Sequence, residues 1–149
     1  MSFVNRVVID TSTLISVVLK PQSIPRQAFL RAITSAKICV SPATLEELER
    51  VLMRDKFDTY LNKDSRLQFF RHYKANTMLY PVTIEEESSL APPCRDPLDH
   101  KFLALARHCS AKVLISSDDD LLMLNPWQNI PIISPADFLK LSEKGNALS

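Results

Sequence analysis

The sequence predicts an α/β protein, a three-layer α/β/α sandwich with a central parallel sheet. Two observations predict it. Short apolar runs rich in β-branched residues alternate along the chain with amphipathic, helix-like stretches. The runs are apolar at consecutive positions, as strands are when helices cover both faces of a sheet. The chain has 149 residues, and we expect a single domain over 1–149 with an ordered core of about 4–142.

Four apolar runs predict the strands. Three of them, Val7–Ile9, Ile38–Val40 and Val113–Ile115, contain only apolar residues, and we expect them to be inner strands. The fourth, Ile130–Ile133, contains Pro131. Because proline has no N–H to donate to a neighbouring strand, this run is expected at an edge of the sheet.

The helices are marked mainly by how they begin. Three stretches start with a capping residue followed by proline at the first helical position. These pairs are Ser41-Pro42, Asp96-Pro97 and Ser134-Pro135. The apolar spacing within residues 65–79 predicts a further amphipathic helix. Polar and acidic residues from Glu85 to Cys94 predict an exposed loop.

Composition excludes several kinds of nucleotide-binding site. The chain has one glycine, Gly145, so it cannot contain a P-loop, a dinucleotide fingerprint or a glycine-rich kinase loop. The 18 Lys and Arg residues nearly balance the 17 Asp and Glu residues, giving a net charge of +1. Bulk charge therefore points to no particular partner.

The cysteines and the N-terminal sequence predict a reduced, cytoplasmic protein. Cys39, Cys94 and Cys109 are odd in number and have no CxxC spacing, which favours neither a disulfide framework nor a zinc site. The first ten residues lack the pattern of a signal peptide, and no apolar run is long enough to span a bilayer. We expect no membrane partner.

Charge is uneven along the chain although its total is balanced. The stretch Arg50–Lys74 has seven basic residues and three acidic ones, whereas Glu85–Asp99 has five acidic residues and one arginine. Either stretch can be an ordinary solvated surface. The alternative is a basic flank beside an acidic centre.

Two carboxylates follow directly from predicted strands. Asp10 comes after Val7–Ile9, and Asp118 follows Val113–Ile115 after two serines. Ligands of open parallel sheets bind beyond the carboxyl ends of the strands, so these two acids converge if their strands are neighbours. The competing interpretation is that each acid only caps the helix that follows it.

Two further carboxylates lie on predicted helices. Glu47 lies about 40° from Val51 around its helix, at the edge of the buried stripe. Asp99 borders the apolar side of its helix through Leu103, although Asp96 and Asp99 are also explained as acids at a helix start. Both could face a cleft, and both could be ordinary border residues.

The chemistry of four carboxylates points to a metal. Asp10, Glu47, Asp99 and Asp118 could not all stay ionised together without a cation. Hard oxygen ligands in excess favour Mg²⁺ or Mn²⁺, and the reaction that suits such a site is metal-assisted phosphodiester hydrolysis. The histidines show no metal-binding spacing.

Five segments also carry a family resemblance. They are DTSTLIS at 10–16, SPATLEELERVL at 41–52, CRDPLDHKFLALA at 94–106, LISSDDDLL at 114–122 and IPIISPADFL at 130–139. In this order and spacing they resemble the PIN-domain (PilT N-terminus) family, in particular its VapC-like toxin branch. The resemblance covers about residues 4–142.

The resemblance implies a fold, an activity and partners. The fold is the PIN α/β/α sandwich, and the activity is Mg²⁺- or Mn²⁺-dependent cleavage of RNA by the toxin component of a toxin–antitoxin pair. The partners implied are the RNA substrate, a cognate antitoxin and a second copy in a homodimer. With RNA as the substrate, we expect the basic stretch Arg50–Lys74 to contribute contacts, among them Arg66 and Arg71. The four family acids map onto Asp10, Glu47, Asp99 and Asp118. Asp96 and Asp120 match acids that have at most supporting roles.

Three positions depart from the family pattern. Ser12 stands where the family commonly has Asn, Ser117 where Gly is common, and His100 where an acid is frequent. The Ser12 departure leaves a catalytically weak RNA-binding or partner-docking module as the main alternative. Aspartyl-phosphate phosphatases and receiver domains also have an Asp after the first strand. Both normally have a second acid close to that Asp, and Asp10 has no acidic neighbour, since Ser12 stands two residues after it.

Overall fold

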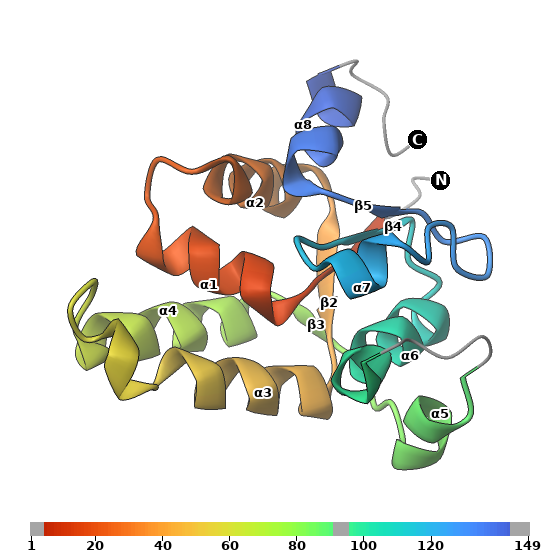
Figure 1. The fold of residues 1–149 in the computed structure, drawn as a ribbon, viewed down its shortest axis with the longest axis horizontal. Helices are drawn as coiled ribbons and strands as arrows, with labels where there is room; N and C mark the ends of the chain where they lie inside the picture. Colours follow the sequence, from red (N-terminus) through yellow and green to blue (C-terminus); the bar gives the residue numbers. More distant parts are fainter. Residues whose placement is uncertain (1–4, 91–95, 144–149) are drawn as a thin grey trace.

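The computed structural model describes residues 5–90 and 96–143. Its centre is a five-stranded sheet in the order β3-β2-β1-β4-β5, with every pairing parallel (Figure 1). The strands are β1 (Arg6–Ile9), β2 (Lys37–Val40), β3 (Met78–Leu79), β4 (Val113–Ile115) and β5 (Ile132–Ile133). The predicted fold class is confirmed, as is the edge position of β5. The strands β1 and β4 are neighbours, which meets the condition under which Asp10 and Asp118 converge.

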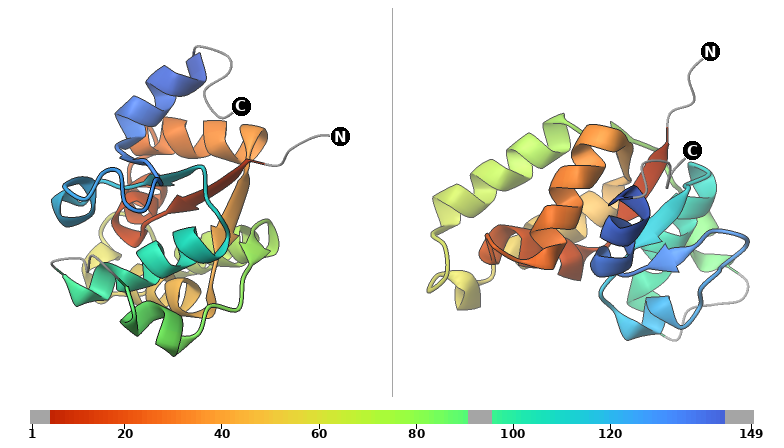
Figure 2. Two further views of the ribbon diagram at one scale, coloured as in Figure 1. Left: turned by 90° about the vertical axis from the view of Figure 1, so that its right-hand side faces the viewer. Right: turned by 90° about the horizontal axis from the view of Figure 1, so that it is seen from above.

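Helices cover both faces of this sheet. They are α1 (Thr11–Leu19), α2 (Ile24–Ser35), α3 (Pro42–Leu52), α4 (Lys63–Ala75), α5 (Ile84–Ser88), α6 (His100–His108), α7 (Asp119–Leu122) and α8 (Pro135–Glu143), with single 3₁₀ turns η1 (Asp55–Phe57) and η2 (Pro97–Asp99). In the left view of Figure 2 the sheet lies between α2 and α8 on one side and α6 on the other.

Alternation along the strands builds two cores. On β1, Val7 and Ile9 pack into the cluster that includes α1, α2, α3, α4 and α8, whereas Val8 packs against α6. Leu114 of β4 joins Val8 on the α6 side. Because both faces are covered, the inner strands must be apolar at every position, and this explains why their sequences read as unbroken apolar runs.

The predicted helix starts are confirmed, with one local difference. Ser41 caps α3 by accepting from the Thr44 N–H, and the Ser134 hydroxyl oxygen accepts from the Asp137 N–H at the start of α8. Asp96 caps a 3₁₀ turn that Pro97 begins, and the α-helix itself starts three residues later at His100.

Two expectations about the middle of the chain are wrong. The helix predicted over 65–79 ends at Ala75, where Asn76 closes it, and Met78–Leu79 pair with β2 as an edge strand. The loop predicted over Glu85–Cys94 begins with the short helix α5, because Thr83 and Glu86 cap each other's backbone N–H groups. Residues 91–95 of that loop lie outside the described residues.

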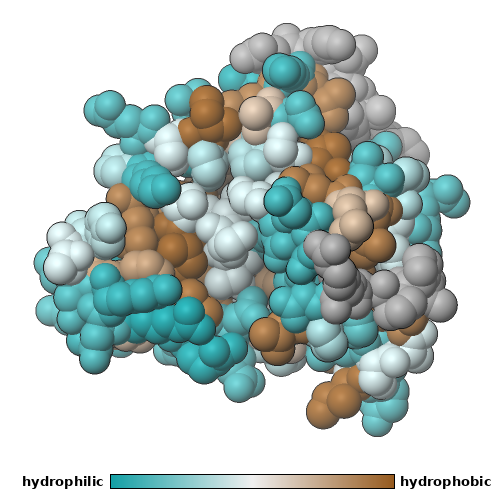
Figure 3. All heavy atoms as spheres, viewed as in Figure 1, coloured by the Kyte–Doolittle hydropathy of each residue, from teal (hydrophilic) through white to brown (hydrophobic). Residues whose placement is uncertain are grey.

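Cys39 and Cys109 are buried free thiols, whereas Cys94 lies outside the described ranges. Within the described residues, no helix combines the length and apolar character that crossing a membrane requires. Hydrophilic side chains gather over α3 and the turn that follows it (Figure 3). That surface borders the site described next.

Candidate functional site

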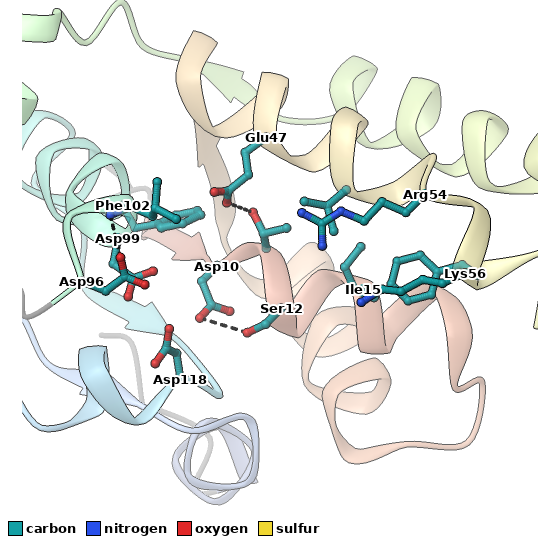
Figure 4. A pocket seen from close by; sticks show the side chains of 14 residues that line it. Asp10, Ser12, Ile15, Glu47, Arg54, Lys56, Asp96, Asp99, Phe102 and Asp118 are labelled. Carbon is teal, nitrogen blue, oxygen red and sulfur yellow. Dashed lines mark hydrogen bonds between the residues drawn. The ribbon is translucent and has the colours of Figure 1, made fainter.

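A pocket of about 460 Å³ opens beyond the carboxyl ends of β1 and β4 (Figure 4). The four acids selected from the sequence all line it: Asp10, Glu47, Asp99 and Asp118. They come from four separate segments, namely the ends of β1 and β4, the middle of α3 and the turn before α6. The sheet order brings these segments together, because β1 and β4 are hydrogen-bonded neighbours.

Asp10 is the most buried acid of the pocket, with 3% of its surface exposed. It caps α1 by accepting from the Thr13 N–H at 3.1 Å, and its other oxygen accepts from the hydroxyl of Ser116. Ser12 also donates to it, at a longer 3.4 Å. Burial raises the pKa of the Asp10 carboxyl against these hydrogen bonds.

Asp99 and Asp118 face one another across the acidic end of the pocket. Asp118 caps α7 by accepting from the Asp120 N–H at 2.8 Å, whereas Asp99 makes no capping bond to α6. Asp99 is 9% exposed. Burial first, and then the charges of Asp118, Asp96 and Asp10, raise its pKa to about 7.

Asp96 and Asp120 complete a carboxylate cluster. One oxygen from each of Asp96, Asp99 and Asp120 lies within 4.8 Å of the others. We use the name acidic cluster for Asp10, Asp96, Asp99, Asp118 and Asp120. Capping accounts for part of what Asp10, Asp96 and Asp118 do, as the competing interpretation expected. It does not account for the convergence of five carboxylates or for the raised pKa of Asp99.

Glu47 lies apart from the acidic cluster on the α3 wall. Lys101 donates to its Oε1 at 2.8 Å, and the hydroxyl of Thr11 donates to its Oε2. The side chains of Lys101 and Glu47 are only 15% and 14% exposed. Lys101 was not selected from the sequence. Its one signal is its position two residues after Asp99, in the first turn of α6.

The far end of the pocket is basic. Arg54, Lys56 and Phe57 line it. In Figure 4, Arg54 and Lys56 lie opposite Asp96, Asp99 and Asp118. The basic flank expected over Arg50–Lys74 is therefore present beside the acids, but the choice of Arg66 as an RNA contact is wrong. Arg66 is fully buried and donates to the backbone carbonyl oxygens of Leu52 and Arg54 at 2.6 and 2.9 Å.

Comparison with known proteins identifies the family of this chain. The family model of the PIN domain matches residues 6–120. This chain belongs to the PIN-domain family. An uncharacterized protein of Methanocaldococcus jannaschii is 29% identical over 150 residues, which is 93% of this chain and 92% of that protein.

Solved structures share the fold at low sequence identity. VapBC2 from Rickettsia felis, solved bound to a DNA fragment from its promoter, has a TM-score of 0.62 and 11% identity over 87% of this chain and 98% of its own. Mycobacterium tuberculosis VapC20, described as a sarcin–ricin loop cleaving toxin, has a TM-score of 0.54 and 13% identity over 76% of this chain and 91% of its own. FitAB bound to a DNA fragment gives 0.55 and 14%, over 87% and 94%.

The strand order separates this fold from the receiver alternative. Flavodoxin-like receivers have the order 2-1-3-4-5, whereas the sheet here runs 3-2-1-4-5. The strand order therefore excludes a receiver domain, and the family match over residues 6–120 sets aside the aspartyl-phosphate phosphatase.

Proposed function

We propose that this protein is a metal-dependent endoribonuclease and the toxin component of a toxin–antitoxin pair, with residues 1–149 acting as one domain. The observation that carries the proposal is the acidic cluster of a PIN-domain protein: four of its carboxylates line one pocket, and the fifth, Asp120, lies close to Asp96 and Asp99. Like charges so close together favour binding of a divalent cation.

The donor set fits a hard cation. All the candidate ligands are carboxylate oxygens, which Mg²⁺ and Mn²⁺ prefer over nitrogen or sulfur. Asp10, Glu47, Asp99 and Asp118 would hold the ion, with Asp96 and Asp120 beside Asp99. When bound, the ion would polarise the phosphodiester and activate the attacking water.

The surrounding residues orient this donor set. Ser116 and Thr13 fix the carboxylate of Asp10 from two sides, which leaves little rotational freedom to lose on binding. Lys101 and Thr11 hold Glu47 at the α3 wall. Leu98 and Phe102 form an apolar part of the lining.

The toxin role rests on likeness to named proteins. VapBC2 and FitAB were solved with DNA as toxin–antitoxin complexes, and VapC20 is described as cleaving the sarcin–ricin loop. By this likeness we propose a cognate antitoxin, RNA as substrate, a homodimer and a cytoplasmic location. A neighbouring reading frame for a small DNA-binding protein that co-purifies with this chain would support the antitoxin partner. Its absence would favour RNA processing.

The decisive test is cleavage of labelled RNA with Mg²⁺, Mn²⁺ or EDTA. We expect cleavage with either metal, none in EDTA, and none by Asp10→Asn. Asp64→Asn is a matched control, because Asp64 is exposed on α4 and does not line the pocket. Cleavage that persists in EDTA would overturn the metal mechanism. Binding without cleavage under every metal condition would establish the catalytically weak module.

A further inference from the structure

Two basic side chains line the pocket from the turn between α3 and α4. Arg54 and Lys56 flank Asp55 at this turn, are exposed, and line the pocket together with Phe57. Figure 4 shows them across the pocket from Asp96, Asp99 and Asp118, with Ile15 beside them. The pocket therefore has an acidic end and a basic end, and one elongated ligand could contact both.

The acids of the same turn already have partners. Asp55 pairs with Lys63 at 2.8 Å, and Asp58 pairs with both Lys63 and Arg66. Among the residues that the structure describes, Arg54 and Lys56 form no ion pair, and the ammonium of Lys56 lies 5.2 Å from the centre of the Phe57 ring. The positive charge that faces the pocket is therefore not cancelled within the turn.

The turn is also fixed from inside the protein. The guanidinium of the buried Arg66 donates to the carbonyl oxygens of Leu52, at the end of α3, and Arg54, at the start of the turn. These two hydrogen bonds hold the turn against the protein interior. A further backbone bond joins the Phe57 N–H to the Arg54 carbonyl at 3.1 Å. A ligand that binds Arg54 and Lys56 consequently meets a backbone that is already ordered, which lowers the entropic cost of binding.

We infer that Arg54 and Lys56 form a subsite for a backbone phosphate of a nucleic-acid strand, next to the bond that is cleaved at the acidic cluster. The inference rests on the proposed function. A strand presents phosphates at regular intervals, so one can bind the basic end while another reaches the acids once a cation neutralises them. An acidic peptide fits less well, because its side chains would meet the acidic cluster in the same pocket.

The test measures binding separately from cleavage. A short fluorescein-labelled single-stranded RNA is titrated by anisotropy with Ca²⁺ in place of Mg²⁺, and a gel confirms that the RNA stays intact. Arg54→Gln/Lys56→Gln should weaken binding about tenfold near physiological salt. It should also lower the slope of log affinity against log salt by about 0.7 to 1.4, since each phosphate contact on a single strand contributes about 0.7.

The matched control is Lys37→Gln/Lys112→Gln. It removes the same charge from exposed positions at the amino ends of β2 and β4 that do not line the pocket, and its affinity and salt slope should stay close to those of the unaltered protein. Equal losses in both double variants would overturn the subsite and leave only a diffuse basic surface. Binding of a fluorescein-labelled polyglutamate peptide that depends on Arg54 and Lys56, in a protein that does not bind the RNA, would overturn it in favour of an acidic protein segment.

The cleavage assay keeps the two proposals apart. Normal binding by Arg54→Gln/Lys56→Gln, together with cleavage by the unaltered protein, contradicts the subsite and leaves the nuclease in place. Weakened binding by this variant, in a protein that cleaves no RNA under any metal condition, supports the subsite and contradicts the nuclease.

Discussion

Carboxylates at the acidic end of the pocket and at the turn after α3 have pKa values shifted in opposite directions. At the acidic end, Asp10 and Asp99 have raised pKa values because burial and neighbouring carboxylates disfavour their charge. At the turn after α3, hydrogen bonding to Lys63 and Arg66 lowers the pKa of Asp58. The acids of the turn are paired within the protein itself, whereas the acidic end becomes satisfied only when something positive binds. This difference separates residues that stabilise the fold from residues available for function.

The largest effect should come from the acidic end. Asp99→Asn removes the central carboxylate of the acidic cluster, and cleavage of RNA should fall on the order of 10³-fold, equivalent to about 4 kcal/mol of transition-state stabilisation. The melting temperature without metal should stay the same or rise, because a buried like charge is gone. Rates and melting curves for Asp99→Asn and the control Asp64→Asn check this. Cleavage near the unaltered rate would show that the acidic cluster is not the catalytic centre.

At the turn, a comparable change should affect stability rather than chemistry. Arg66→Met leaves the buried carbonyl oxygens of Leu52 and Arg54 without their side-chain donor, and we expect the free energy of unfolding to fall by about 2–4 kcal/mol. Asp58 keeps Lys63 as its partner. Denaturant unfolding measures it. Arg71→Met on the exposed side of the same helix should change stability by less than about 0.5 kcal/mol. Equal effects of the two substitutions would contradict the role given to Arg66.

Much of the fold and the acidic end could be predicted because they follow from local pattern. Apolar runs marked β1, β2, β4 and β5, and the acids that follow β1 and β4 had to share one edge of a parallel sheet. Helical geometry brought Glu47 to the border of α3. These inferences need only the chain's own periodicity and the general rule for parallel sheets.

What could not be predicted depends on contacts between distant segments. Arg66 has the same charge as its basic neighbours, and only the carbonyls at the end of α3 explain why it is buried. Lys101 and Glu47 are 54 positions apart, and no spacing rule links them. Met78–Leu79 continue the apolar pattern of α4, so only pairing with β2 reveals a strand.

Lowering the pH should change the contributions of Asp99 and Asp58 to folding stability in opposite directions. Asp99 has a pKa raised from 3.8 to about 7, so between these values the folded protein binds this proton more tightly than the unfolded chain does. Without metal, its contribution to stability is therefore full below about pH 4 and is lost as the pH rises through about 7. Asp58 contributes the reverse, since its lowered pKa gives stability that is lost as the pH falls.

Melting curves in EDTA across this pH range measure the balance. Asp99→Asn should flatten the fall in stability between about pH 4 and 7, and saturating Mg²⁺ should flatten it in the unaltered protein. A fall that is equally steep in Asp99→Asn would assign the effect to another group.

A smaller effect should appear when metal is added to Asp118→Asn. Mg²⁺ at about 100 times its dissociation constant should stabilise the unaltered protein by about 2.7 kcal/mol, or roughly 5–10 °C in Tm. Asp118→Asn should raise the Tm without metal, abolish cleavage and shrink the Mg²⁺ shift. If Asp118 only caps α7, asparagine should replace it with little change in Tm. A full Mg²⁺ shift in Asp118→Asn would then remove Asp118 from the metal site.

The smallest effect tests whether Glu47 is a metal ligand or only the ion-pair partner of Lys101. In the metal-free protein it is held by Lys101, and a double-mutant cycle with Glu47→Gln and Lys101→Met should give a coupling energy of about 1 kcal/mol for this largely buried pair. If Glu47 is a metal ligand, as the sequence predicts, Mg²⁺ competes with the Lys101 ammonium for the same carboxylate. The coupling measured by denaturant unfolding should then fall at saturating Mg²⁺. An unchanged coupling energy would show that Glu47 keeps Lys101 as its partner when Mg²⁺ is bound. The metal site would then be restricted to the acidic cluster.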